Sequence, residues 1–387
     1  MKRSSERILT THTGSLPRSP ELLELVYARA DGKQVDEATW ERTVRDEVAA
    51  TVRRQIEVGV DIVSDGEVGK RGYSIYVQDR LTGFEGEGSF PRVPDMVEFP
   101  DFTERLMRVE GEGMQHLRTP ACTGPIRVKD AAASQRDIES LKAAAAGSGA
   151  QEVFMTAASP GVIAFFLENR YYPNHEEYVG AIADAMREEY EAIASAGFTL
   201  QLDCPDLAFA PSRFAAFGDM DAEEIKRAVE LNVEALNHAT SAIDPEQMRL
   251  HVCWGNYAGP HVFDVPLREI IDVVLRARPN GISIEACNPR HAHEWKLFEE
   301  VELPEDKVLI PGVVDSTTNY VEHPEVVAQR LERYARLVGM ERVIAGTDCG
   351  FETFAGFSAV APTVVWRKLE AMAEGARIAT RELTVRT

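Results

Sequence analysis

Short apolar runs alternate with longer amphipathic stretches along most of the chain. The runs are rich in β-branched residues and end in small or polar residues, a pattern typical of buried strands. Between most of them, apolar residues recur at helical spacing. The predicted strands cover residues 8–12, 61–65, 153–157, 199–203, 248–253, 281–285, 308–314 and 342–347. The predicted helices include residues 35–58, 178–196, 222–242, 266–278 and 324–338.

Eight alternations of strand and helix predict an α/β fold with a parallel sheet closed into a (β/α)8 TIM barrel. We expect residues 1–387 to form one barrel domain, because no internal repeat or linker indicates a second. Residues 84–150 do not show this alternation, and we predict that they form an excursion between the second and third strands. A further strand pair around residues 107–128 would make it either a hairpin over the barrel mouth or a surface insertion.

Composition limits the classes of partner. The 387 residues carry 42 Lys and Arg against 63 Asp and Glu, a formal charge of −21, which disfavours nucleic acid and anionic membrane surfaces. No apolar run approaches the roughly 20 residues that span a bilayer. The basic N-terminus lacks the apolar run of a signal peptide, and five cysteines do not suggest a disulfide framework. We therefore expect a cytoplasmic protein.

The ends of the predicted strands carry an unusual set of side chains. TIM-barrel active sites form at the carboxyl ends of the strands, where His251 and Cys253 share one face of the fifth strand. Glu285 ends the sixth strand, and Cys349 follows the eighth. One imidazole, one carboxylate and two thiolates from separate strands are a ligand set that suits tetrahedral zinc. Cys287 has the same strand parity as Glu285 and is the alternative thiol.

Several short motifs, in the same order along the chain, resemble the catalytic barrel of cobalamin-independent methionine synthase. This family lies within the wider group of zinc-dependent thiol alkyltransferases, whose single-barrel relatives include epoxyalkane:coenzyme M transferase. The fold is also similar to that of uroporphyrinogen decarboxylase. The matching pieces are TGSLP at 13–17, DGE at 65–67, LDCP at 202–205, HVC at 251–253, Glu285, PGVVD at 311–315 and DC at 348–349.

The resemblance implies a site and an activity. It implies that Zn2+ is bound by His251, Cys253, Glu285 and Cys349, and that the amino-acid substrate is held by Gly14, Ser15, Glu67 and Asp203. Zinc would activate a small thiol such as homocysteine as its thiolate, which then accepts a methyl group. The implied activity is 5-methyltetrahydropteroyltriglutamate–homocysteine S-methyltransferase, an enzyme of methionine biosynthesis.

One departure puts the methyl donor in doubt. The family has a histidine two residues after the aspartate of the PGVVD segment, where it protonates the departing folate nitrogen. This chain has Thr317 there, and a hydroxyl group is not a general acid near neutral pH. His291 and His323 remain candidates for the acid, and the catalytic residue is left unassigned.

Other functions remain open at this stage. A coenzyme M-like thiol could open an epoxide, its sulfonate being bound by Arg18 or by Lys70 and Arg71. A metal-free decarboxylase would need several cationic residues and no thiol cluster, and a zinc-binding protein without catalysis would need a closed metal site. The expected partners are a small-molecule thiol and an alkyl donor, with a homo-oligomer left open.

Overall fold

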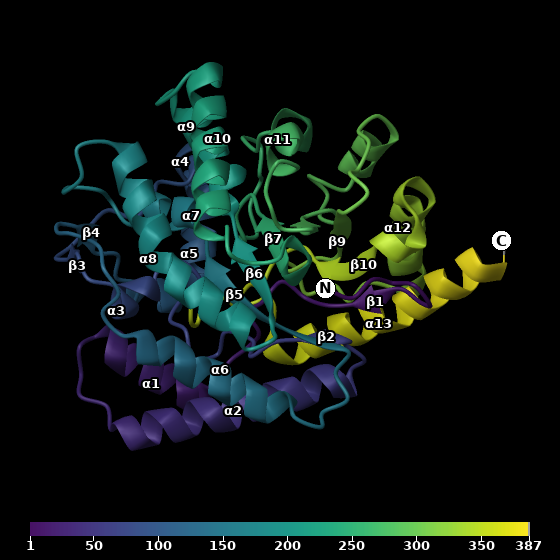
Figure 1. The fold of residues 1–387 in the computed structure, drawn as a ribbon, viewed down its shortest axis with the longest axis horizontal. Coiled ribbons are helices and arrows are strands. Elements are labelled where there is room, and N and C mark those ends of the chain that lie inside the picture. The colour runs from purple at the N-terminus through teal and green to yellow at the C-terminus, as the bar shows by residue number, and fades with distance from the viewer. Residues whose placement is uncertain (386–387) are drawn as a thin grey trace.

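The computed structural model describes the backbone of residues 1–385 and the side chains of 1–108 and 116–385. The last two residues of the predicted domain, 386 and 387, lie outside this described part. Eight parallel strands form one barrel-like sheet (Figure 1), which confirms the predicted (β/α)8 architecture. These are β1 (Leu9–Thr10), β2 (Ile62–Val63), β5 (Glu152–Ala158), β6 (Thr199–Asp203), β7 (Met248–Val252), β8 (Gly281–Ile284), β9 (Val308–Val314) and β10 (Ile344–Thr347).

Helices surround this sheet, and all five predicted helices are present, four of them with slightly different bounds. The helix that joins the last two strands, for example, has its predicted bounds, Pro324–Val338. The described helices are α1 (Pro20–Ala30), α2 (Glu37–Glu57), α3 (Val77–Arg80), α4 (Pro94–Glu98), α5 (Pro100–Gln115), α6 (Ala131–Ala145), α7 (Pro160–Phe166), α8 (His175–Ser195), α9 (Phe209–Phe217), α10 (Ala222–Ala239), α11 (Leu267–Val274), α12 (Pro324–Val338) and α13 (Pro362–Val385). In the described chain, no helix is long and apolar enough to cross a membrane.

The sheet closes between β1 and β2 through side chains more than through backbone pairing. The strand order runs from β1 through β10, β9, β8, β7, β6 and β5 to β2. Across the remaining gap, the Asp61 amide donates to the Thr10 carbonyl at 3.1 Å, and Thr11 Oγ1 donates to the Ile62 carbonyl at 3.2 Å. The Asp61 carboxylate also accepts from the Thr10 amide at 3.0 Å and forms an ion pair with Arg7. Asp61 therefore links the two end strands.

The expected excursion is present, but its structure differs from the prediction. The predicted strand pair around residues 107–128 is wrong, because residues 100–115 form helix α5. The two-stranded sheet of this region instead pairs β3 (Phe84–Glu85) with β4 (Ala121–Cys122). Proline at the first turn of α5 and the helix-forming residues that follow favour a helix over a strand.

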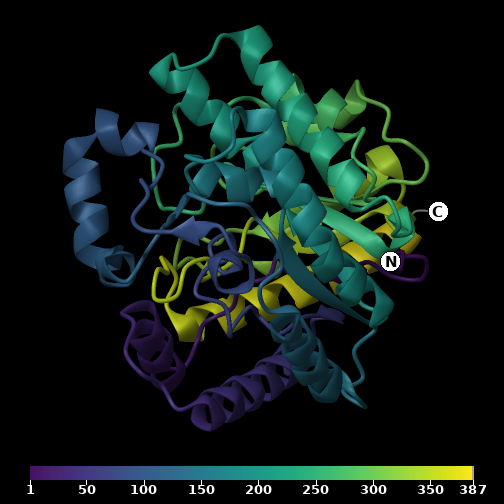
Figure 2. The ribbon, with the colours of Figure 1, turned by 60° about the vertical axis from the view of Figure 1, so that its left-hand side comes forward.

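Helix α6 belongs to the outer ring of the barrel, where it packs against α2 and α8. The segment that leaves the barrel is therefore shorter than residues 84–150. Figure 2 shows its helices α4 and α5, in blue, projecting on the left side of the molecule. This arm supplies part of the pocket wall described below.

Just after β6, a 3-10 turn (Pro205–Leu207) places Asp206 in the protein interior. Ser159 Oγ donates to Asp206 Oδ1 at 2.6 Å, and burial raises the pKa of Asp206 to about 7. Because an unfolded aspartate has a pKa near 4, the folded protein holds this proton more tightly, and stability falls as pH rises from about 4 to about 7.

Asp206→Asn should therefore stabilise the protein mainly at alkaline pH. The amide keeps the contact with Ser159 and offers a donor to Asn232, whose Oδ1 is buried and has no partner among the described groups. We expect the free energy of unfolding at about pH 8 to rise by ~2–4 kcal/mol, with a smaller gain at about pH 5. Urea titrations at the two pH values measure this, and an equal change at both would contradict it.

Candidate functional site

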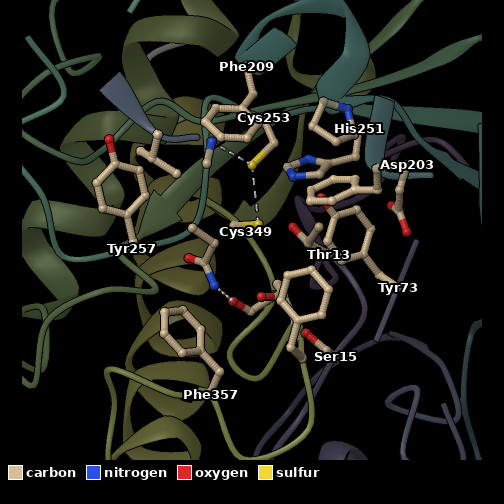
Figure 3. Close-up of a pocket in the computed structure, with 18 of the residues that line it drawn as sticks. Thr13, Ser15, Tyr73, Asp203, Phe209, His251, Cys253, Tyr257, Cys349 and Phe357 are labelled. Carbon is tan, nitrogen blue, oxygen red and sulfur yellow. Dashed lines mark hydrogen bonds between the residues drawn. The ribbon is translucent and has the colours of Figure 1, made fainter. Parts of the chain in front are cut away.

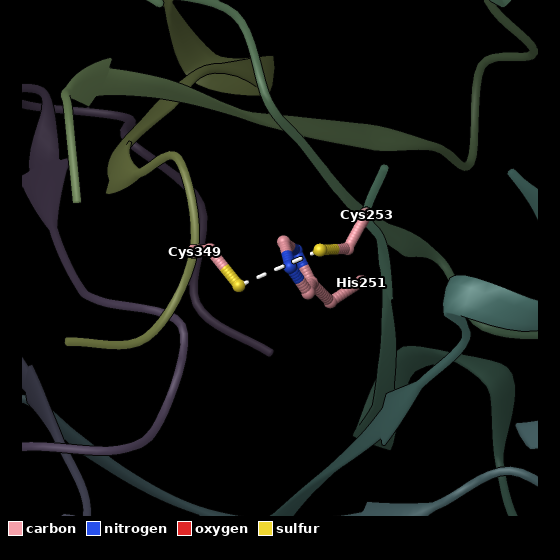
Figure 4. Close-up of side chains that lie close together, drawn as sticks. All are labelled: His251, Cys253 and Cys349. Atoms are coloured by element: carbon pink, nitrogen blue, oxygen red, sulfur yellow. Dashed lines mark hydrogen bonds between the residues drawn. The ribbon is translucent and has the colours of Figure 1, made fainter. Parts of the chain in front are cut away.

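Two thiols and an imidazole meet at the carboxyl ends of β7 and β10. The ligand atoms of His251, Cys253 and Cys349 all lie within 4.8 Å of one another, and all three residues are buried. The Sγ atoms of Cys253 and Cys349 are 3.6 Å apart (Figure 4). Two sulfur atoms and one nitrogen at this spacing are a donor set that suits a metal ion with a soft or borderline character.

Strand geometry accounts for the position of His251 and Cys253. Side chains alternate along β7, so these two residues point to the barrel interior while Val252 packs in the outer hydrophobic core. After the strand, Trp254 turns outward and its indole Nε1 donates to the Val265 carbonyl at 2.7 Å. The Gly255 amide donates to Cys253 Sγ at 3.2 Å, which fixes the direction of the thiol.

Cys349 is held in place by its neighbour, Asp348. The Asp348 carboxylate accepts from the backbone amides of three residues that follow β8, at 2.8–2.9 Å: Ala286, Cys287 and Asn288. Gly312 on β9 allows this close approach, since a Cβ there would lie 2.1 Å from Asp348 Oδ1. The ends of β8, β9 and β10 are thereby fixed relative to one another, and with them the Cys349 thiol.

His251 has the environment of a metal ligand. Its Nδ1 contacts Ser283 Oγ at 3.2 Å, which orients the ring, while its buried Nε2 has no hydrogen-bond partner among the described groups. Burial, and then the charge of Arg249, lowers the pKa of His251 to about 3, so the imidazole is neutral at physiological pH. A neutral ring with a free buried nitrogen is the form that binds a metal.

The protein environment alone does not ionise the two thiols. The adjacent Cys349 thiol, and then burial, raise the pKa of Cys253 well above its usual value. The pKa of Cys349 is lowered by its contact with Cys253, but burial and the Glu285 carboxyl outweigh this and leave it raised. A metal cation between the two sulfur atoms would reverse this preference, because coordination stabilises the thiolate form.

Glu285, the fourth predicted ligand, lies beside the group but outside the set of atoms within 4.8 Å. Its Oε1 accepts from the Trp254 amide at 2.7 Å, and its Oε2 accepts from Asn288 Nδ2 at 2.9 Å. Burial, and then the Cys253 thiol, raise the pKa of Glu285 well above its usual value. The structure thus brings three of the four predicted ligands together and keeps the fourth next to Cys253, held by other partners.

The other candidates from the sequence lie elsewhere. Cys287, the alternative thiol, donates to Asp348 Oδ2 at 3.2 Å. His291 contacts Glu294 through Nδ1 at 2.9 Å and Asp264 through Nε2 at 3.0 Å. Thr317 donates to Asp315 at 2.8 Å, and His323 is exposed at the start of α12. None of these four residues lines the pocket that contains the thiols.

Two acidic side chains lie in the same pocket as the thiols. Glu67 and Asp203 are both buried; burial raises the pKa of each, and for Asp203 the negative charge of Glu67 adds to the effect. Glu67 has a left-handed backbone with φ of 56°, a strained conformation for a side chain of this size. Its Oε2 has no hydrogen-bond partner among the described groups. A cation bound beside the pair would favour the ionised form of both carboxyl groups.

Ser15 and Gly14 complete the region around Glu67. Ser15 lines the pocket, and its Oγ accepts from the Glu352 amide at 3.3 Å. Gly14 allows the Glu67 carboxylate to approach the backbone, since a Cβ at this position would lie 2.3 Å from Glu67 Oε1. The structure therefore brings the four predicted substrate-binding residues together beside the thiols.

One cavity, of about 90 Å³, is lined both by the acidic pair and by the two cysteines. Figure 3 shows Asp203, Cys253 and Cys349 in this pocket. Its remaining wall is mainly apolar and aromatic, and the arm that contains α4 and α5 covers it with Phe90, Val93, Met96 and Met107. The arm is attached to the barrel through Asp95, whose carboxylate accepts from the Tyr257 hydroxyl at 2.7 Å and from the His261 amide. The arm therefore forms a cover over the site.

A sequence profile of the family described as "Cobalamin-independent synthase, Catalytic domain" matches residues 8–376. This chain belongs to that family. Within the cobalamin-independent synthase family, the methionine synthase of Saccharolobus solfataricus is 24% identical over 377 residues, which cover 97% of this chain and 95% of that protein. The methionine synthase of Thermococcus kodakarensis is 24% identical over 375 residues, 97% of this chain and 94% of that protein.

Solved structures agree with the cobalamin-independent synthase fold. A B12-independent methionine synthase from Shewanella sp. W3-18-1, in complex with selenomethionine, superposes with a TM-score of 0.75 at 20% identity, covering 98% of this chain and 99% of the other. The putative vitamin-B12-independent methionine synthase from Listeria monocytogenes has a TM-score of 0.65 at 19% identity, covering 96% and 98%.

For this member of the cobalamin-independent synthase family, the sequence did not predict the apolar half of the pocket. Phe90, Phe166 and Phe354 come from three distant segments, and no periodic pattern connects them. Asp95, which attaches the arm to the barrel, was also missed. The only sequence signal was its position in a Gly- and Pro-rich segment between two strands, where functional loops often occur.

Proposed function

We propose that this protein is a zinc-dependent methyltransferase that transfers a methyl group to the thiol of homocysteine. The observation that carries the proposal is the buried group of His251, Cys253 and Cys349, which shares a pocket with the acidic pair Glu67 and Asp203. The family and its methionine synthase relatives support the reaction. A relative with bound selenomethionine, the selenium analogue of the expected product, supports the substrate class.

We assign zinc to His251, Cys253 and Cys349, with Glu285 as a nearby carboxylate that completes the predicted set. The free Nε2 of His251 and the 3.6 Å separation of the sulfur atoms support this assignment. When bound, zinc acts as a redox-inert Lewis acid that lowers the pKa of a substrate thiol, so that its sulfur is a nucleophile at neutral pH. In this structure Glu285 is hydrogen-bonded to Trp254 and Asn288, so three side chains converge on the proposed zinc site and the carboxylate lies beside them.

The chain's own side chains orient the acceptor. Glu67 and Asp203 would pair with the substrate ammonium, and this contact offsets the cost of two buried carboxylates. Gln201 Nε2 donates to Asp203 Oδ1 at 2.8 Å, and Arg249 Nε donates to Gln201 Oε1 at 2.7 Å, so the carboxylate is fixed before the substrate arrives. Ser15 would bind the same amino-acid end, and the apolar cover would exclude water from the reacting sulfur.

The alternative with a sulfonate-bearing thiol has less support. Arg18 is buried and donates to the backbone carbonyls of Glu67 and Lys70 at 2.8 Å, while Lys70 Nζ donates to Thr156. Neither these two cations nor Arg71 lines the pocket. Two carboxylates beside the thiols would also repel a sulfonate.

The test is product formation by the zinc-loaded full chain. Homocysteine and a panel of methyl donors are incubated with the protein, and methionine is measured by mass spectrometry. We expect methionine with at least one donor, and no methylated product from 2-mercaptoethanesulfonate. A thioether formed from that sulfonate and an epoxide, with no methionine from any donor, would replace this proposal with the epoxide reaction.

A further inference from the structure

Four aromatic rings form a continuous wall in the pocket. Tyr73, Phe90, Phe166 and Phe354 all line the cavity that contains the two thiols. The ring centroids of Phe166 lie 5.9, 5.4 and 6.0 Å from those of Tyr73, Phe90 and Phe354, and Phe354 lies 5.5 Å from Tyr73. Aromatic side chains grouped in this way can bind an organic cation through cation–π attraction.

The wall extends to the sulfur atoms through Tyr73. Tyr73 lines the same cavity as Cys253 and Cys349, and Figure 3 shows its ring in the pocket with both thiols. Gly72, the residue before Tyr73, leaves room for the Phe354 ring, since a Cβ at Gly72 would lie 2.5 Å from Phe354 Cδ1. A group held against these rings is therefore held next to the acceptor sulfur.

The charge in the pocket has one sign. Glu67 and Asp203 are its acidic residues, and no lysine or arginine is among the described residues of the lining. Because the two carboxylates are assigned to the ammonium of the acceptor, the donor meets the rest of the wall, which has no cationic side chain among its described residues to pair with an anionic donor. A small cationic donor would be stabilised by the aromatic rings through cation–π attraction.

Among the described residues that line the pocket, no histidine other than His251 could protonate a departing amine. Thr317 and His291 are engaged with carboxyl groups away from the cavity, and His323 is exposed on α12. His251 is the proposed metal ligand, and the two carboxylates face the ammonium of the acceptor. The pocket therefore does not favour a donor whose leaving group must be protonated as it departs. A donor that leaves as a neutral molecule needs no acid at all.

We infer that the methyl donor is a small methylated onium compound, either a sulfonium or a quaternary ammonium. This inference rests on the proposed methyl transfer to homocysteine. The acceptor gives its thiol proton to solvent, and its sulfur forms a bond to the methyl carbon. The bond between that carbon and the donor sulfur or nitrogen breaks, and its electron pair stays on the departing atom. The donor leaves as a neutral thioether or tertiary amine.

The first experiment compares donors on the zinc-loaded full chain with homocysteine. The donors are dimethylsulfonioacetate, glycine betaine, 5-methyltetrahydrofolate triglutamate and methylcobalamin, and methionine is measured by mass spectrometry. Methionine from either onium donor supports the inference, and the pair distinguishes sulfonium from ammonium. Methionine from the folate or from methylcobalamin alone would overturn the inference and leave the methyltransferase function intact. No methionine from any donor would overturn both.

The second experiment tests the aromatic wall itself. 3,3-Dimethylbutanoate is the carbon analogue of betaine, in which an uncharged tert-butyl group replaces the trimethylammonium group. Its inhibition constant should be at least about 10-fold higher than the dissociation constant of betaine. Phe354→Leu should raise KM for the active onium donor about 10-fold and leave KM for homocysteine unchanged. Phe298→Leu, a buried phenylalanine outside the pocket, controls for general loss of packing. Equal affinity for betaine and its carbon analogue would overturn the cation–π basis.

Discussion

Replacing Cys349 with serine is expected to release zinc and to lower kcat/KM for methyl transfer by more than about 100-fold. The Cys349 thiol lies 3.6 Å from that of Cys253, and the two sulfurs are the soft donors of the site. A hydroxyl group is not ionised under conditions that form a thiolate, so serine cannot replace the lost ligand. Zinc per chain, measured by elemental analysis, and the rate of methionine formation test this expectation.

Cys287→Ser is the matched control. This thiol is also buried near the carboxyl ends of the strands, and it donates to Asp348 Oδ2 at 3.2 Å, a contact that a serine hydroxyl can keep. The control should retain zinc and activity. If Cys349→Ser binds zinc as well as the unchanged protein does, the assignment of Cys349 as a ligand is wrong. If both variants lose zinc together with their thermal transition, the loss reflects unfolding.

Replacing Asp203 with asparagine is expected to raise KM for homocysteine about 10- to 100-fold with little change in shape. The variant removes half of the negative charge that faces the substrate ammonium, while Gln201 can still contact the side chain. The deciding measurement uses 4-mercaptobutanoate, which has the thiol and the carboxylate of homocysteine but no amino group. Its kcat/KM should change little between the two proteins.

The ratio of kcat/KM for homocysteine to kcat/KM for 4-mercaptobutanoate shows whether the effect of Asp203→Asn depends on the amino group. Asp206→Asn, three residues further on, changes a buried aspartate that lies outside the pocket, and it should leave the ratio unchanged. If Asp203→Asn lowers the activity with both thiols by the same factor, Asp203 supports the structure of the site and does not recognise the amine.

The sequence predicted the barrel well because its signals are local. Each strand needs only a short apolar run, and the runs at β6 and β9 have the predicted bounds. The candidate ligands could be found in the same way, since strand parity places His251 and Cys253 on one face and barrel topology brings strand ends together. Glu285 shows the limit of this reasoning. Parity placed it at the site, but its hydrogen bonds to Trp254 and Asn288 depend on the loops.

The arm and the aromatic wall could not be predicted by the same means. The second half of helix α5 fell in the predicted strand pair around residues 107–128, because the few apolar residues there do not show a clear helical period. The four rings of the wall lie on segments as far apart as Tyr73 and Phe354, and only the folded barrel brings them together. The donor-binding wall could not be predicted because it is built from long-range contacts. The metal site could be predicted because its residues lie at strand ends, which the sequence pattern locates.

The closure of the barrel at Asp61 affects where the sheet opens locally. Between most neighbouring strands, a ladder of amide bonds must break before the strands separate, whereas β1 and β2 are joined by few backbone bonds and by the side chain of Asp61. Local opening should therefore have its lowest free energy at this edge. In hydrogen–deuterium exchange, the amides of β2 should lose protection before those of β7 and β8, so the strand that carries His251 stays ordered while the opposite edge fluctuates.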